Sequence, residues 1–173
     1  VPVSGGPVPP AVLIVPRRNN GPIIALDAAA GTALSVQYVG FGGTRELDAF
    51  YGLNRARDGE DFEEALRHLD VGSQNFVYAD THGDIGYLMA GAMPLREDLE
   101  AGIVNGLPPF FIRNGTGGNE WLPAPPSPDQ PLPYQLLPFE EQPQATNPDS
   151  GVILNANNDP VGNTLDNKLR NWA

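Results

Sequence analysis

Cysteine is absent from the 173 residues, which excludes a disulfide framework, a thiolate nucleophile and a cysteine-based zinc site. No run reaches the roughly 18 apolar residues that a membrane-spanning helix needs, and the apolar run at residues 11–15 is too short for the core of a secretory signal peptide. Basic residues are few: 10 Lys and Arg stand against 21 Asp and Glu, giving a net charge of −11. Such a surface opposes binding to nucleic acid or anionic lipid. We therefore expect neither a nucleic acid nor a membrane among its partners.

Glycine and proline, by contrast, are abundant, with 20 and 19 residues. Together they form about a fifth of the chain, above the roughly 12% of an average protein. Many turns and irregular connections are expected, and a helical bundle is disfavoured. Apolar residues still make up 40% of the chain, so its composition is not that of a disordered protein.

Short apolar runs bounded by proline or glycine indicate strands in the first part of the chain. Strands are predicted at residues 11–15, 22–26 and 33–39. Helices are predicted at residues 45–56 and 58–69. In the second helix Phe62, Ala65, Leu66 and Leu69 follow the spacing of one apolar stripe, and acidic residues gather at its start, where the helix dipole favours them.

The clearest local pattern is a hairpin. Residues 74–80 and 84–90 are rich in aromatic and β-branched side chains, and Gly83 in the link allows a positive φ angle. Residues 91–121 are expected to form a long loop. Residues 122–143 contain eight prolines, which excludes a helix interior or a central strand, so we expect an extended segment packed over the surface.

Residues 151–156 are predicted to form a last short strand. Strands combined with two helices indicate an α+β sheet protein, mainly antiparallel, with long proline-rich loops. We treat residues 1–173 as a single partial domain with a proline-rich excursion at 122–143, since the last residues stop without a turn or a helix cap.

Four segments, in order, resemble the β-chain of penicillin acylases, which are N-terminal-nucleophile (Ntn) hydrolases. The chain departs from the family pattern at Asn20, where a histidine is common, and in the length of the proline-rich stretch. The matching segments span most of the chain and comprise residues 20–24, the hairpin at 74–87 with its preceding helix, residues 91–96, and residues 137–139 followed by 147–148 and 151–160.

The resemblance implies an internal fragment of an αββα sandwich and an activity in amide hydrolysis. In Ntn enzymes a Ser, Thr or Cys at a newly made chain N-terminus attacks the carbonyl, and its own α-amine, with a pKa near ~8, acts as the base. Val1 has no nucleophilic atom, and the α-amine of Ser4 is tied into a peptide bond. We expect the nucleophile to lie upstream, and these 173 residues alone to be catalytically silent.

Asn157 is the residue that the resemblance identifies as catalytic. In the family, the first asparagine of an Asn-Asn pair donates its side-chain amide to the oxyanion of the tetrahedral intermediate. A neutral NH₂ group suits this task, because it stabilises developing negative charge without a proton transfer. The alternative is a turn residue before Asp159 and Pro160, a position that asparagine often takes.

Four further residues carry weaker predictions. Asn155 and Asn158 either orient the Asn157 side chain or cap local backbone. Gln74 stands where the family places an acyl-pocket side chain, and the alternative is a surface residue at the end of a strand. The resemblance requires no cofactor but allows a structural calcium ion in the parent protein, with Asp166 as a ligand; a lone aspartate can equally be a solvated carboxylate, since calcium needs six to eight oxygens.

Other residues with reactive side chains are interpreted as structural. His68 and His82 share no motif with a serine and an aspartate, so a Ser-His-Asp triad has no support. Asp80 and Asp84 are expected to shape the hairpin turn. Arg96 is expected to pair with a carboxylate, and Trp121 to be a buried anchor.

The expected partners are a small-molecule amide substrate and the remaining segments of the acylase precursor, its α-chain and the rest of its β-chain. A fragment of such a sandwich should expose apolar side chains and associate with those segments or with itself. By resemblance the location is periplasmic or extracellular. The alternative function is a non-catalytic acidic α+β domain that binds a partner, and this reading demands a stop near Ala173 in the parent gene.

Overall fold

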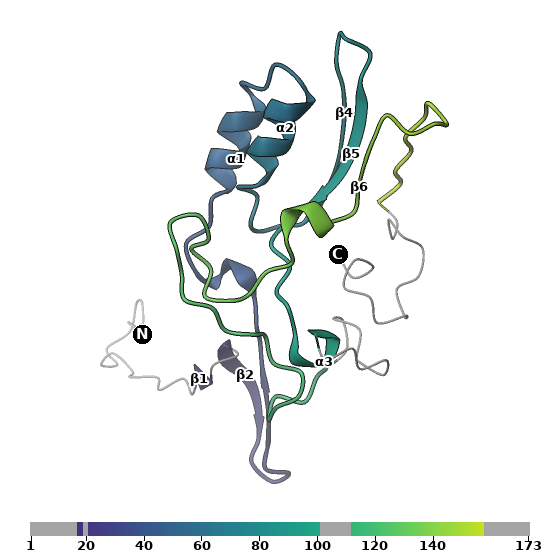
Figure 1. Cartoon of the computed structure of the whole chain (residues 1–173). Helices are drawn as coiled ribbons and strands as arrows, with labels where there is room; N and C mark the ends of the chain where they lie inside the picture. The colour runs from purple at the N-terminus through teal and green to yellow at the C-terminus, as the bar shows by residue number, and fades with distance from the viewer. Residues whose placement is uncertain (1–16, 19–20, 101–111, 158–173) are drawn as a thin grey trace, which may run out of the picture. The chain divides into compact units, whose positions relative to one another are not determined.

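The computed structural model describes residues 17–18, 21–100 and 112–157 (Figure 1). The chain divides into two compact units between Tyr38 and Val39, and each is described by itself. The predicted strand at residues 11–15 lies outside the described residues. The prediction of a single partial domain stays a prediction.

The first unit contains a three-stranded antiparallel sheet in the order β1-β2-β3. Its strands are β1 (Arg17–Arg18), β2 (Gly21–Asp27) and β3 (Thr32–Ser35). The turn between β2 and β3 is closed by Asp27, whose Oδ1 accepts hydrogen bonds from the backbone N–H groups of Ala29 and Ala30. The strand predicted at 33–39 is confirmed only at its start, because the chain turns into a short 3₁₀ helix, η1 (Val39–Phe41).

The second unit begins with the two predicted helices, which are shorter than expected. They are α1 (Glu46–Leu53) and α2 (Gly59–Leu66). Asp58 starts α2 by accepting a 2.9 Å hydrogen bond at Oδ1 from the Asp61 N–H, which satisfies one of the unpaired donors of the first turn. The helices approach closely at Gly52, where a Cβ atom would lie 2.7 Å from the Cβ of Ala65.

A second antiparallel sheet, in the order β4-β5-β6, follows the helices. The predicted hairpin is confirmed as β4 (Gln74–Ala79) and β5 (Ile85–Ala90). Gly83 adopts φ +96° in the link, and Asp80 Oδ1 accepts from the N–H groups of His82 and Asp84. As predicted, Asp80 shapes the turn, and these backbone bonds, the one to Asp84 first, hold the pKa of its carboxyl below its usual value.

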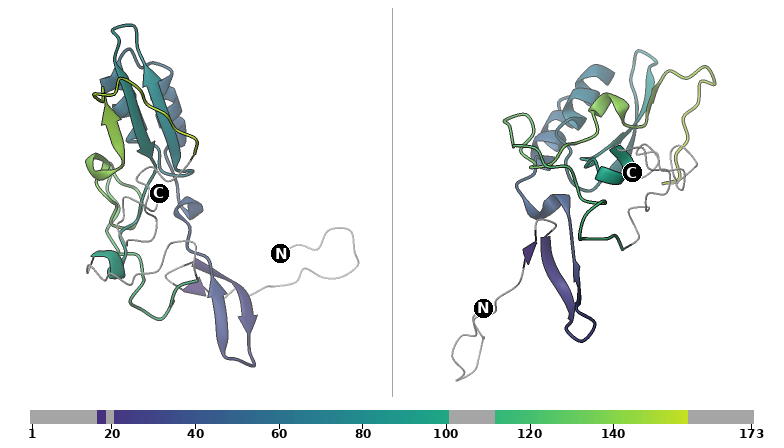
Figure 2. Two further views of the ribbon diagram at one scale, coloured as in Figure 1. Left: turned by 90° about the vertical axis from the view of Figure 1, so that its right-hand side faces the viewer. Right: turned by 60° about the horizontal axis from the view of Figure 1, so that its bottom comes forward.

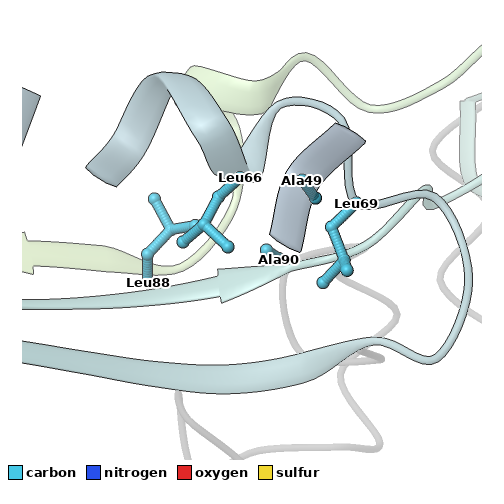
Figure 3. Packing of buried hydrophobic residues seen from close by; sticks show 5 residues of the cluster. All are labelled: Ala49, Leu66, Leu69, Leu88 and Ala90. Atoms are coloured by element: carbon cyan, nitrogen blue, oxygen red, sulfur yellow. The ribbon is translucent and has the colours of Figure 1, made fainter. Parts of the chain in front are cut away.

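One face of this sheet packs against the two helices and forms the core. Ala49, Leu66, Leu69, Leu88 and Ala90 form the buried cluster (Figure 3). Phe62 of α2 lies edge-on to Phe76 of β4, with ring centroids 6.2 Å apart. The apolar stripe predicted for α2 is therefore the buried side of that helix.

The predicted strand at residues 151–156 is wrong. These residues lie in irregular backbone, with Val152 and Leu154 exposed. The third strand of the sheet is instead β6 (Gln144–Thr146), which pairs with β5 from Gly86 to Leu88. Because β6 already occupies that edge of β5, the apolar run that follows cannot pair there.

The proline-rich residues 122–143 are extended, as predicted, but they contribute to the interior more than expected. Leu132 and Leu137 are buried, and isolated bridges join Pro94 to Leu136 and Pro123 to Tyr134. The segment ends in a 3₁₀ turn, η2 (Phe139–Glu141). Proline excludes a regular ladder here, yet the intervening leucines still bury their side chains.

Within its described residues, 91–100 and 112–121, the expected loop contains one short helix, α3 (Glu97–Glu100). Just before it, Arg96 pairs with Asp98 in a buried ion pair, with 3.0 Å between Nε and Oδ1, which confirms the predicted carboxylate partner. Trp121 is half-buried and meets the ring of Tyr134 edge-on at 4.7 Å. None of the helices in the described part of the chain has the length and apolar character needed to cross a bilayer.

We expect Leu66→Ala to lower the free energy of unfolding by about 2–4 kcal/mol, because it opens a cavity in the core. Leu66 is 1% exposed, whereas Leu47 on the neighbouring helix is 85% exposed. Leu47→Ala is therefore the matched control, with an expected change within about 0.5 kcal/mol. Urea unfolding followed by circular dichroism measures both, and equal losses for the two variants would contradict this assignment of the core.

Candidate functional site

The candidate site lies on the face of the β4-β5-β6 sheet that the helices do not cover. Side chains alternate along a strand, so Phe76 and Tyr78, which contact Phe62, share the helix face, and Asn75 and Val77 point to the other. The left view of Figure 2 shows the segment after β6 crossing this second face, with the helices behind the sheet. Figure 1 agrees, with helices and segment on opposite sides.

Asn147 attaches the start of this crossing segment to the hairpin. Its Oδ1 accepts a 2.9 Å hydrogen bond from the Ile85 N–H, and its Nδ2 donates a 2.8 Å bond to Asp84 Oδ1. Its own N–H donates to the Ile85 carbonyl. Asn147 adopts φ +46°, a left-handed conformation that asparagine tolerates better than most residues, and the chain turns away from β6 here.

Asn157 lies at the far end of the segment and is exposed. Its backbone has φ +56°, and its N–H donates a 2.8 Å hydrogen bond to Asn155 Oδ1. This Asn155 bond is an Asx turn, which fixes the backbone from which the Asn157 side chain projects. The prediction that Asn155 orients the Asn157 side chain or caps local backbone remains a prediction, and this hydrogen bond is compatible with it.

The Asn157 side chain contacts the sheet through its oxygen. Asn75 Nδ2 donates a 3.1 Å hydrogen bond to Asn157 Oδ1, and the Tyr87 hydroxyl donates a 2.6 Å bond to Asn75 Oδ1. Burial raises the pKa of Tyr87 above its ordinary value, so its hydroxyl stays a protonated donor at neutral pH. Three neutral side chains from β5, β4 and the crossing segment are thus joined in one chain of hydrogen bonds.

This arrangement leaves one donor group unused. Among the described residues, the Asn157 side-chain NH₂ group has no hydrogen-bond partner. The hydrogen bond at the carbonyl oxygen fixes the amide, so its NH₂ group can donate to an anionic oxygen that approaches from solvent. Chemically, it can bind the oxygen of a tetrahedral intermediate without exchanging a proton.

Of the three remaining predicted site residues the structure describes Gln74, and it is not brought together with Asn157. Gln74 is exposed and pairs with Ala90, and by alternation it shares the helix face with Phe76, so its acyl-pocket role stays a prediction. Asn158 and Asp166 lie outside the described residues. Within the part of the chain that the structure describes, no three His, Asp or Glu residues are grouped so as to hold a metal ion.

A hollow in the second unit shares no lining residue with this network. Arg45 and Asp70 line it together with Gln142. Arg45 binds the buried Asp70 carboxylate through both Nε and an Nη atom, at 3.0 and 2.8 Å, and the carboxylate raises the pKa of the guanidinium further. Both charges of this pair are satisfied, and the contact joins the start of α1 to the loop after α2.

Comparison with known proteins assigns the chain. The penicillin amidase family model matches residues 1–173. The chain belongs to the penicillin amidase family. It is therefore also a member of the Ntn-hydrolase superfamily, as the resemblance predicted.

Individual members of the penicillin amidase family support this assignment. Penicillin G acylase of Escherichia coli is 38% identical over 86 residues, which is 50% of this chain and 8% of that protein. Penicillin acylase 2 proenzyme of Pseudomonas sp. strain SE83 is 27% identical over 82% of this chain and 16% of its own length. Acyl-homoserine lactone acylase QuiP of Pseudomonas fluorescens Pf0-1 is 33% identical over 48% of this chain and 10% of its own. The chain thus spans only a small part of these relatives.

The fold agrees with the family. A structure of thermostable penicillin G acylase from Alcaligenes faecalis matches 85% of this chain with a TM-score of 0.62 and 26% sequence identity, and the match covers 23% of that structure. The two helices and the antiparallel sheets are thus an α+β part of a penicillin amidase, as predicted from the sequence.

Sequence reasoning named Asn157 and Asn155 as candidates and missed the residues that contact them. Asn75, Tyr87 and Asn147 all lie within the segments that resemble the family, yet no role was assigned to them. One signal was available for two of them. With Val77 opposite Tyr87 in the hairpin, Asn75 and Tyr87 are diagonal neighbours on one face, within reach of a long side chain.

We expect Asn147→Ala to destabilise the end of the sheet by about 1–3 kcal/mol, because it removes two side-chain hydrogen bonds and places alanine at positive φ. Amide hydrogen exchange at Ile85 should become faster. Asn147→Gly is the matched control: it loses the same bonds but adopts φ +46° without strain, so its loss should be smaller by about 1 kcal/mol. Unchanged exchange at Ile85 in both variants would contradict this role.

Proposed function

We propose that this chain is the part of an Ntn amidohydrolase that supplies an oxyanion donor, the side-chain NH₂ group of Asn157. The reaction is hydrolysis of an acyl-amide bond. An N-terminal nucleophile from another part of the parent protein attacks the carbonyl carbon, and negative charge develops on the carbonyl oxygen. A preoriented neutral donor aimed at that oxygen lowers the energy of the transition state more than that of the substrate.

The observation that supports this proposal is the state of the Asn157 amide. Its oxygen is engaged by Asn75 at 3.1 Å, and its NH₂ group has no partner among the described residues. A turn residue that only shapes the backbone would not need a side-chain bond to a strand 82 positions earlier in the chain. The family membership of the chain makes an oxyanion the natural acceptor.

The names of the relatives support a proposal for the substrate class. Two are described as penicillin acylases and one as an acyl-homoserine lactone acylase. All three names denote removal of an acyl group from an amide nitrogen. We therefore propose an N-acyl small molecule as substrate, without a choice between penicillins and other acyl amides.

We further propose that the chain works in association with the remaining segments of its precursor. One relative is described as a proenzyme. On α1 the side chains of Leu47, Phe50 and Tyr51 are exposed. Exposed apolar side chains gathered on one helix are typical of a surface that another protein segment covers.

A periplasmic or extracellular location and a structural calcium ion bound through Asp166 belong to the same proposal and rest on the family resemblance.

The test is Asn157→Ala in the processed full-length acylase that contains this segment. We expect kcat to fall about 10²–10³-fold with KM changed little, because the lost donor acts mainly in the transition state. Asn114→Ala is a control for the loss of an asparagine side chain, since among the described residues the Asn114 side chain is hydrogen-bonded to Thr116 of its own turn alone. A variant with unchanged kcat would remove Asn157 from the catalytic site.

These 173 residues expressed alone are expected to show no hydrolysis of phenylacetyl or fatty-acyl amides, because no residue among them is proposed as the nucleophile. The measurement is release of the amine product at high protein concentration. The full-length processed protein is the positive control. Turnover by the 173 residues that survives Asn157→Ala would argue for a different catalytic group within the chain.

A further inference from the structure

We propose that Asn75 is a positioning residue: it sets which end of the Asn157 amide faces the substrate. The inference rests on the proposed function, in which Asn157 donates to an oxyanion. It adds a role for two residues of the hairpin, Asn75 on β4 and Tyr87 on β5, that do not themselves touch the reacting atoms.

A primary amide can present either of two ends. Rotation of the Asn157 side-chain amide by half a turn exchanges its oxygen and its NH₂ group with almost no change of shape. In one orientation the amide donates to an approaching oxyanion, and in the other its carbonyl oxygen repels that anion. An exposed asparagine with no fixed partner would populate both, so a catalytic donor needs a neighbour that distinguishes them.

Asn75 provides that distinction. Its Nδ2 group donates to Asn157 Oδ1 at 3.1 Å, so the Asn157 oxygen is held against the sheet and its NH₂ group points elsewhere. Asn75 is the second residue of a regular six-pair hairpin ladder, opposite Met89, and Met89 is buried. The strand backbone therefore holds Asn75 more firmly than the irregular segment 151–157 could hold Asn157 by itself.

Asn75 is also a primary amide and has the same two orientations. The Tyr87 hydroxyl decides between them by donating to Asn75 Oδ1 at 2.6 Å, which directs the Asn75 NH₂ group toward Asn157. The donors then run in one direction, from Tyr87 through Asn75 to Asn157 and on to the substrate oxygen. Hydrogen bonds arranged in such a series polarise one another and strengthen the last donor.

The test exploits the chemistry of Asn75→Asp in the processed full-length acylase. An aspartate has the same shape and still accepts from Tyr87, but it has no NH₂ group to donate. Its second oxygen would attract the Asn157 NH₂ group, so the Asn157 carbonyl oxygen would face the substrate in place of the NH₂ group. We expect kcat to fall about 10–100-fold with KM within a few-fold, approaching the loss of the donor itself.

A double-mutant cycle separates positioning from a general structural effect. If Asn75 acts through Asn157, Asn75→Asp should have little further effect on kcat in the Asn157→Ala background. Asn114→Asp is the matched control for the added charge: the Asn114 side-chain oxygen accepts from the Thr116 N–H and hydroxyl, so aspartate keeps both bonds. Its kcat should equal that of the unaltered enzyme.

Tyr87→Phe is a second variant for the case that Asn75→Asp impairs folding or processing. It removes the donor to Asn75 without adding a charge, and we expect a several-fold fall in kcat that disappears in the Asn157→Ala background. If Asn157→Ala leaves kcat unchanged, the proposed function itself fails. If Asn157→Ala lowers kcat but both Asn75→Asp and Tyr87→Phe leave it unchanged, or lower it equally in both backgrounds, the positioning role is overturned while the proposed function stands.

Discussion

The antiparallel ladder between β4 and β5 is the constraint on which the second unit depends. Six backbone pairs, from Gln74 with Ala90 to Ala79 with Ile85, fix the register. Because successive side chains point to opposite faces, this register sends Phe76, Leu88 and Ala90 toward the helices and Asn75 and Tyr87 to the other side. A shift of one residue would exchange the two sets and abolish both the core and the polar pair.

Each face of the hairpin then organises a different part of the chain. On the helix face, apolar burial fixes α1 and α2, and the close approach at Gly52 sets how near the helices lie. At the outer edge of β5, β6 brings the chain back from the proline-rich segment. The left-handed turn at Asn147 then directs the chain across the opposite face, where Asn157 meets Asn75. The proposed donor is thus placed by a buried core that it does not touch.

The polar network differs from the ion pairs elsewhere in the chain. Arg45 with Asp70 and Arg96 with Asp98 are pairs of opposite charges with buried carboxylates, and each ties irregular backbone in place. The Tyr87, Asn75 and Asn157 side chains carry no charge, and their bonds run in one direction toward an NH₂ group that has no partner among the described residues. A neutral donor series suits an oxygen that becomes negative only in the transition state, since a fixed cation would also bind anions in the ground state.

Local sequence patterns were sufficient for elements whose stability is local. The stripe of Phe62, Ala65, Leu66 and Leu69 predicted α2 and its buried side, and the alternation around Gly83 predicted the hairpin. Local patterns failed for strands, whose formation depends on a partner strand that is distant in the sequence. The apolar residues 151–156 looked like a strand but had no place beside β5, whereas Gln144–Thr146 became a strand because β5 was available as a partner.

The sequence by itself determined the α+β class, the hairpin and the family, because periodicity and ordered motifs are written along the chain; it also named Asn157 as the candidate that the proposed function uses. Only the tertiary structure decided that Asn157 meets Asn75, that the Tyr87 hydroxyl donates to Asn75, and that Gln74 faces the helices instead of Asn157. Those facts depend on strand register and on hydrogen bonds between residues 82 positions apart. Such contacts exist only after the core has fixed the sheet, and no local pattern specifies them.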